Sequence, residues 1–165
     1  MSEARKCTRC EQFKLPTEFY SVNRIYCIDC ERTSASVRMN RYNKTLRGRA
    51  SQALQTSRKT IKRNGYDVLD DLTLMDVIFT FAHSDGECAY CGKVTDNYHL
   101  EHIVPLSANG PNTFSNIVTS CGGCNSSKGN QDLLEWREFD EVAAVIDGIA
   151  SRRGCTIAEV LEELK

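Results

Sequence analysis

The sequence contains no long apolar run, and it has no apolar segment near its amino terminus. A membrane-spanning helix needs about 20 mainly apolar residues, whereas the apolar stretch "VAAVIDGIA" is short and carries Asp147. We therefore expect no membrane association, no secretion and a cytoplasmic location, which includes a phage protein inside its host cell. A length of 165 residues suits one ordinary domain or a small domain with an appended module.

Acidic residues are absent between positions 32 and 63, although the whole chain has a net charge of −1. Solvated helix faces normally mix both signs of charge, so a long basic block in an otherwise acidic chain indicates contact with a polyanion. The predicted partner is double-stranded DNA. The candidate DNA contacts in this block are Arg38, Arg41, Lys44, Arg47, Arg49, Arg58, Lys59, Lys62 and Arg63.

Cysteine is abundant for a protein of a reducing compartment, where disulfides are rare. Eight of the nine cysteines form four C-x-x-C pairs: Cys7 and Cys10, Cys27 and Cys30, Cys88 and Cys91, Cys121 and Cys124. Two neighbouring pairs can bind one tetrahedral zinc ion, so the sequence predicts two structural zinc sites. Structural disulfides or a redox C-x-x-C are the alternatives, and neither explains four pairs at one spacing. Cys155 is left over, and we expect a small buried residue there.

The chain reads as a zinc module followed by helices and one hairpin. We expect Phe13, Phe19, Tyr20 and Tyr26 to form a minimal core around the first zinc. Helical periodicity predicts one long helix over residues 32–63 and a second helix over 73–86. Residues 98–104 and 115–120 read as short strands. Further helices are expected from about Asn125, near 133–136, over about 141–151, and after Thr156.

The candidate catalytic residues lie near the end of the strand expected over residues 98–104. If the backbone kinks before Pro105, Glu101 and His102 can face one volume together with Asn125 from the next helix. A carboxylate and an amide oxygen are suitable ligands for Mg²⁺. An imidazole with a reference pKa of about 6.5 can accept a proton from an attacking water. This combination suits metal-dependent cleavage of a phosphodiester.

The motifs "CAYCG", "LEHIVPLSANG", "SNIV" and "CGGCNSSKGN" resemble those of the HNH endonuclease family over about residues 86–131. The resemblance implies a ββα-metal fold with His102 as the general base. It also implies that Glu101 and Asn125 hold the catalytic divalent metal, Mg²⁺ or Mn²⁺. Asn116 would hold the hairpin loop and orient His102 through backbone contacts. The usual dipeptide of the family is Asp-His, so Glu101 is a longer ligand. The amino-terminal module and basic segment loosely resemble small phage and restriction enzymes of this group.

The predicted fold class is α+β: a ββα-metal nuclease core stapled by a four-cysteine zinc site, with an amino-terminal four-cysteine zinc module and flanking helices. The predicted domains are residues 1–31 (zinc module), 32–66 (basic DNA-contacting segment), 67–138 (nuclease core) and 139–165 (carboxy-terminal helices).

Several alternatives stay open at this point. The chain could be a zinc-dependent DNA-binding or adaptor protein that does not cleave, or a nuclease specific for branched DNA. A monomer could nick one strand, whereas a homodimer could cut both strands. Lys128 could contact a phosphate or be a solvated lysine. His99 shares strand parity with Glu101, so it could be an extra metal ligand or a half-exposed strand residue.

Overall fold

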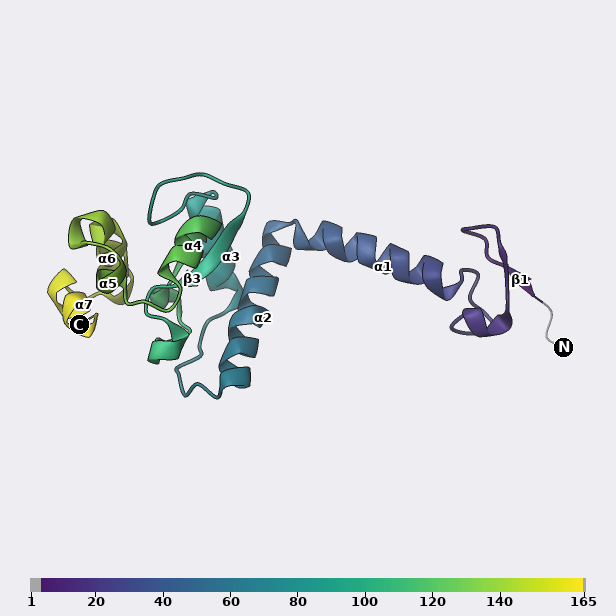
Figure 1. Cartoon of the computed structure of the whole chain (residues 1–165), viewed down its shortest axis with the longest axis horizontal. Coiled ribbons are helices and arrows are strands. Elements are labelled where there is room, and N and C mark those ends of the chain that lie inside the picture. Colours follow the sequence, from purple (N-terminus) through teal and green to yellow (C-terminus); the bar gives the residue numbers. More distant parts are fainter. Residues whose placement is uncertain (1–3, 165) are drawn as a thin grey trace. The chain divides into compact units, whose positions relative to one another are not determined.

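The computed structural model describes residues 4–164, which form two compact units that divide between Thr45 and Leu46. Figure 1 shows the elements of both units in chain order. The division falls inside the basic segment predicted for residues 32–66, so that segment contributes residues to both units. In the described range, no helix is long and apolar enough to cross a membrane.

Cysteine side chains, rather than aromatic ones, fill the centre of the amino-terminal unit. Strands β1 (Arg5–Lys6) and β2 (Phe13–Lys14) pair antiparallel, and a 3-10 turn, η1 (Pro16–Glu18), follows them. Helix α1 (Ile28–Asn43) begins directly after Cys27, so Cys30 lies in its first turn. The buried cluster consists of Cys7, Phe19 and Cys27, with Cys30 packed against it.

The expected aromatic core of this unit is wrong for three of its four members. Only Phe19 is buried, while Phe13 is 72% exposed, Tyr20 56% and Tyr26 38%. The converging cysteines need little apolar cover, because a bound metal supplies stability that a small core would otherwise have to supply. The other three aromatic rings therefore remain on the surface.

The single helix expected over residues 32–63 is two helices, α1 and α2 (Leu46–Asn64). Helix α1 ends where the amide and the hydroxyl of Thr45 both donate to the carbonyl of Tyr42, at 2.9 and 2.7 Å. No residue of α1 is buried, whereas Ala50 and Leu54 of α2 are. The break therefore separates a helix without an apolar face from one that packs into a core.

Helix α2 packs against α3 (Leu74–Ser84) in the carboxy-terminal unit, which begins at Leu46. Thr73 and Asp76 form the predicted capping box at the start of α3. Its Val77 and Phe81 share a cluster with Ala50, Leu54, Leu72 and Ile117. The side chains of two helices and one strand thus form one side of the hairpin's core.

A two-stranded hairpin and a short helix make the centre of this unit. Strand β3 (Tyr98–His102) pairs antiparallel with β4 (Ile117–Cys121), from Tyr98 opposite Cys121 to His102 opposite Ile117. Helix α4 (Gly122–Lys128) follows β4 without a loop, three residues earlier than expected. The order is therefore strand, strand, helix, as predicted.

The carboxy-terminal helices cover the hairpin from its other side. These are α5 (Leu133–Trp136), α6 (Phe139–Arg153) and α7 (Ile157–Glu163), and the predicted capping box of Thr156 and Glu159 is present. Val142, Val145, Ile146 and Ile149 of α6 are buried with Ile103 and Val118 of the hairpin region. The prediction of an α+β chain of helices and small sheets is confirmed.

Candidate active site

His102, the last residue of β3, is joined to two polar side chains that the sequence analysis did not single out. Its Nε2 lies 2.8 Å from Asn112 Oδ1, and Asn112 Nδ2 donates to Asp70 Oδ1, also at 2.8 Å. Because the Asn112 amide nitrogen faces a carboxylate, its oxygen faces the imidazole. Nε2 of a neutral His102 must therefore carry the proton, which leaves Nδ1 as the acceptor nitrogen.

Burial lowers the pKa of His102 below its ordinary value of 6.5. The hydrogen bond with Asn112 and the negative charge of Asp70 oppose this effect, whereas the positive charge of Lys128 adds to it. The imidazole is therefore neutral near pH 7. A neutral imidazole with an unprotonated Nδ1 can accept a proton.

Glu101 takes a partner from helix α4. The ammonium group of Lys128 donates to Glu101 Oε1 at 2.9 Å and to the carbonyl oxygen of His102 at 3.0 Å. Burial raises the pKa of Glu101 above its ordinary value, and the charge of Lys128 opposes this rise. Lys128 is fully buried. The two predicted roles of Lys128, a phosphate contact or a solvated lysine, therefore do not fit the structure. Its ammonium group is buried and bonded to two residues of β3.

The side chains of Glu101 and His102 do not share a hydrogen-bond partner, which differs from the predicted kink that would turn both into one volume. The strand pairing continues regularly through His102. Neighbouring residues of a regular strand point to opposite faces. Accordingly, Glu101 contacts α4 and His102 contacts the loop residue Asn112. The strand brings the two residues close along the chain, and Lys128 bridges them by touching one side chain and the backbone of the other.

Asn116 is fully buried and ties the loop between the strands together. Its Oδ1 accepts from the amide of Val104 at 2.9 Å, and its Nδ2 donates to the carbonyls of Val104 and Pro111 at 2.9 and 2.7 Å. The loop also passes close to itself at Gly110, where a Cβ would overlap the carbonyl oxygen of Val104. These contacts hold the segment that carries Asn112 beside His102.

Asn125 and Lys128 lie one turn apart on α4, so their side chains share a face of that helix. Lys128 reaches Glu101 from this face, which places Asn125 on the side of α4 that faces β3. The Lys128 bond uses Oε1 of Glu101 alone. Among the described residues, no hydrogen bond engages Glu101 Oε2 or the side-chain amide of Asn125. One carboxylate oxygen and one amide oxygen fit a hard divalent cation with few protein ligands.

His99 is half-buried near the start of α4. Its Nε2 lies 3.4 Å from where a Cβ of Gly122 would be. In the described part of the chain, no group of three or more potential ligand side chains includes His99. Its role as a metal ligand stays a prediction.

The two predicted cysteine sets each converge on one point. In one cluster the ligands are Cys7, Cys10, Cys27 and Cys30, and in the other Cys88, Cys91, Cys121 and Cys124. Within each cluster the four sulfurs lie within 4.8 Å of one another, and all nine cysteines are free thiols. Four sulfurs at about 2.3 Å from a zinc ion would be about 3.8 Å apart, and the Cys91 and Cys121 sulfurs are separated by 3.9 Å. Both clusters could therefore hold zinc.

Backbone amides support a thiolate in each cluster. The amide of Cys124 donates to Cys121 Sγ at 3.4 Å, and this bond is the main reason that the pKa of Cys121 falls to about 7. In the other cluster, burial opposes ionisation of Cys7. Backbone hydrogen bonds, including one from Cys27 at 3.2 Å, outweigh this burial and lower its pKa to about 6. Metal ligation requires the thiolate form.

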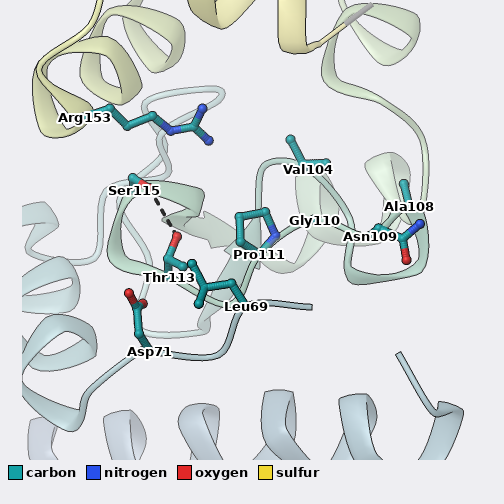
Figure 2. Close-up of a pocket in the computed structure, with 10 residues that line it drawn as sticks. All are labelled: Leu69, Asp71, Val104, Ala108, Asn109, Gly110, Pro111, Thr113, Ser115 and Arg153. Atoms are coloured by element: carbon teal, nitrogen blue, oxygen red, sulfur yellow. Dashed lines mark hydrogen bonds between the residues drawn. The ribbon is translucent and has the colours of Figure 1, made fainter. Parts of the chain in front are cut away.

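A hollow of about 490 Å³ lies beside the loop between β3 and β4. Figure 2 shows Thr113 and Ser115 joined by a hydrogen bond at its wall, with Asp71 and Arg153 on either side of this pair. Glu101, His102, Asn116 and Asn125 are not among the residues that line it. The hollow is a feature of the loop, separate from the predicted catalytic side chains.

The predicted DNA contacts fall into three groups in the structure. Arg38, Arg41 and Lys44 are exposed in the amino-terminal unit, and Arg47, Lys59, Lys62 and Arg63 are exposed on α2. Arg49 and Arg58 bind within the chain instead. Arg49 donates to the carbonyl of Asp96 and lies over the ring of Tyr98. Arg58 donates to the carbonyl of Leu72 at 2.9 Å and pairs with Asp70 at 3.4 Å.

Asn112 and Asp70 are therefore the candidate residues that sequence reasoning missed. Asn112 lies in "GPN", which reads as an ordinary turn, and Asp70 precedes the hairpin by 28 residues in an acidic stretch. Only the fold brings both to His102. The burial of Asn112 would have marked it as special, but a polar loop sequence does not reveal which of its residues are buried.

The comparisons with known proteins agree with the motif resemblance. Residues 88–131 match the family described as HNH endonuclease. The CRISPR-associated endonuclease Cas9 of Corynebacterium diphtheriae is 39% identical over 62 residues, which are 36% of this chain and 6% of that protein. A Bacillus subtilis protein, YoqL, whose name describes a prophage-derived candidate HNH endonuclease, is 26% identical over 115 residues, covering 58% of this chain and 49% of that protein.

A solved Cas9 structure also aligns with the chain. The Type II-C Cas9 enzyme from Actinomyces naeslundii aligns with 88% of this chain and 15% of that chain, at 22% sequence identity and a TM-score of 0.37. The chain spans no more than 49% of the length of either sequence relative.

Proposed function

We propose that the chain is a metal-dependent DNA endonuclease of the HNH type, which hydrolyses phosphodiester bonds. The observation that carries the proposal is the hydrogen-bonded chain from Asp70 through Asn112 to His102, in a hairpin that lies inside the segment matching the HNH family. A neutral imidazole whose free nitrogen is fixed by its neighbours suits a general base.

His102 is the residue that accepts the proton in this mechanism. Asn112 holds its Nε2–H, so Nδ1 takes the proton from the water that attacks the phosphorus. The lowered pKa of His102 keeps the acceptor nitrogen unprotonated near neutral pH. Proton transfer of this kind typically contributes about 10²- to 10⁴-fold to a rate.

Glu101 and Asn125 are the residues that would hold the divalent cation, Mg²⁺ or Mn²⁺. The bound cation would supply a positive charge that stabilises the leaving oxygen. Lys128 holds Glu101 through Oε1 and thereby fixes the carboxylate, so that Oε2 stays available as a ligand atom. Asn116 keeps the loop, and with it Asn112, in register with the strand end.

Double-stranded DNA is the proposed partner, and the exposed basic side chains of α2 are its proposed phosphate contacts. Two structural zinc ions, one in each cysteine cluster, would stabilise the two units.

The direct test is incubation of the zinc-loaded chain with supercoiled plasmid and Mg²⁺ or Mn²⁺, followed by sequencing of the ends. Nicked or linear products that are absent with His102→Ala would support the proposal. Absence of cutting with any divalent ion, in protein that still binds DNA, would favour the second candidate, a non-catalytic zinc-dependent DNA-binding or adaptor protein. The observation in favour of that candidate is the engagement of Glu101 by Lys128.

A further inference from the structure

The amino-terminal unit has a second feature that neither the zinc cluster nor the proposed catalysis uses. A hollow of about 360 Å³ lies between the cysteine-bearing loops and residues 31–38 of α1. We name it the Arg/Tyr hollow after the six side chains that define it: Arg9, Arg24, Arg32, Arg38, Tyr20 and Tyr26. Cys27 directly precedes α1 and Cys30 lies in its first turn, so the cysteine cluster and the hollow both use residues of this helix.

The charge facing this hollow is strongly positive. Four guanidinium groups line it, against the single carboxylate of Glu31, which lies 3.8 Å from Arg24. Within residues 4–164, the side chains of Arg32 and Arg38 make no hydrogen bond or ion pair to another residue. Guanidinium groups bind phosphate oxygens strongly and often in pairs. The hollow is thus suited to an anion, and a phosphate group fits the two arginines without partners.

The two tyrosines add an aromatic surface beside these charges. Tyr20 is 56% exposed and Tyr26 is 38% exposed, so neither belongs to the core. The guanidinium of Arg9 lies over the Tyr26 ring, 5.6 Å from its centre, and Arg9 also donates to the carbonyl of Cys30 at 3.4 Å. The guanidinium of Arg9 therefore lies over one face of the Tyr26 ring, and Tyr20 is a second ring that lines the hollow.

Exposed tyrosine rings beside arginines suit unpaired nucleic acid, because the ring faces can stack on bases. Within a duplex, each base is covered by its neighbours, so a protein ring cannot stack on it. An unpaired base offers its flat face to aromatic side chains while its phosphate binds basic ones. Contact with a duplex backbone could use the arginines and the tyrosine hydroxyls, but it would leave the faces of the two rings unused.

We infer that the Arg/Tyr hollow binds an unpaired nucleotide of a DNA strand, with its base on Tyr20 and Tyr26 and its phosphate on Arg32 and Arg38. The chain then recognises duplex DNA that carries a single-stranded stretch. This inference goes beyond the proposed function, because binding in the hollow requires no cleavage and no residue of the hairpin.

Binding of two labelled DNAs tests the inference, using the full zinc-loaded chain without added divalent ions. One DNA is a blunt duplex, and the other is the same duplex with a short single-stranded overhang. The parent chain is expected to bind the overhang DNA more tightly. Tyr20→Leu and Tyr26→Leu should each weaken overhang binding by about tenfold, as expected for loss of base stacking, and leave blunt-duplex binding unchanged. Tyr20→Phe should keep the preference, because it keeps the ring.

Two substitutions outside the hollow serve as matched controls. Phe13→Leu removes an aromatic ring that is 72% exposed on the same unit, and Arg41→Ala removes one exposed charge of α1. Phe13→Leu should leave the preference for the overhang unchanged. Arg38→Ala should reduce that preference, whereas Arg41→Ala should not.

Zinc content, measured for each variant by release with a thiol reagent, shows whether the unit stays intact. The inference is overturned if the parent binds both DNAs equally. It is also overturned if a fully zinc-loaded Tyr20→Leu protein loses affinity equally for both. A chain that prefers the overhang but cuts no DNA would reject the proposed nuclease function alone.

Discussion

At the scale of single residues, the orientation of one amide group decides which nitrogen of His102 can accept a proton. Asn112 presents its oxygen to His102 because Asp70 holds its nitrogen. Without that carboxylate, the amide can turn over and present its NH₂ group to Nε2. His102 would then carry its proton on Nδ1, and the proposed acceptor nitrogen would be lost. Asp70 is therefore a positioning residue.

Replacement of Asp70 by Ala should lower kcat about tenfold through loss of the reactive tautomer, with KM little changed. The negative charge of Asp70 raises the pKa of His102, so its removal should move the acid limb of the pH–rate profile to lower pH. In the parent, this limb should already lie below pH 6.5, since burial lowers that pKa and the rate falls only when His102 becomes protonated.

The ¹⁵N shifts of the imidazole report the tautomer directly, and the chain has only three histidines. The parent should show Nε2–H at His102, and Asp70→Ala should lose this preference. Asp71→Ala, an adjacent exposed carboxylate, is the control and should change neither the tautomer nor the acid limb. A slower Asp70→Ala enzyme with an unmoved acid limb and the parent tautomer would mean that Asp70 has only a structural role.

A second residue-scale prediction separates the base from the metal ligands. His102→Ala should reduce cleavage by about a hundredfold or more and should not recover at any metal concentration, because the missing step is proton transfer. Glu101→Ala or Asn125→Ala should recover part of the rate at high Mg²⁺ or with Mn²⁺, which binds oxygen ligands more tightly. Equal recovery of all three variants would contradict the division of roles. DNA binding and zinc content should stay at the parent level in His102→Ala.

A motif can single out candidate residues, but it cannot show their partners. The spacing of the motif makes Glu101, His102, Asn116 and Asn125 the candidates, and their roles stay predictions. The sequence could not show that Lys128 is buried, since a lysine in "CNSSKGN" reads as an exposed helix residue. Tertiary contact with β3 decides its state, and that contact joins residues 27 positions apart.

At the scale of elements, the basic helix α2 has one side in the core and one side free. Ala50 and Leu54 pack toward α3, while Arg47, Lys59, Lys62 and Arg63 are exposed. The sequence predicted the helical periodicity of this segment correctly. It missed the end of α1, because Thr45 stops that helix through bonds to Tyr42 rather than through a glycine or proline.

Replacement of Arg47, Lys59, Lys62 and Arg63 by Ala should weaken binding to duplex DNA and flatten its salt dependence. Each lost phosphate contact should reduce the slope of log K against log salt by about 0.9. Replacement of the exposed Lys6 and Lys93, which lie outside the basic block, is the control and should leave the slope unchanged. An unchanged slope in the fourfold variant would show that α2 is not the phosphate-binding surface.

Arg58 is not expected to act as a phosphate contact like these four residues, since its guanidinium is held by Asp70 and the carbonyl of Leu72. It connects α2 with the residue that orients Asn112. The same helix thus presents charge to the solvent and, through Arg58, contacts the Asp70 carboxylate of the candidate site. A count of basic residues in the sequence could not reveal this second role.

At the scale of the whole molecule, the chain consists of two units, each of which contains one four-cysteine cluster. The amino-terminal unit has a buried cluster of only three residues, whereas the carboxy-terminal unit buries two larger clusters. Structural zinc binding supplies on the order of 10 kcal/mol to folding in small zinc domains. The smaller unit should therefore depend on its metal more completely than the larger one.

Metal analysis of protein purified without added zinc should find close to two zinc ions per chain. Cys7→Ser should remove one ion and unfold the amino-terminal unit, while the hairpin unit stays folded and keeps its ion. Cys88→Ser should remove the other ion and destabilise the hairpin, because Cys121 joins β4 to α4 at that cluster. Cys155→Ser, outside both clusters, is the control and should keep both ions. Protein without zinc, with its cysteines in disulfides, would contradict the prediction, since the sulfurs of both clusters are close enough to oxidise instead of binding metal.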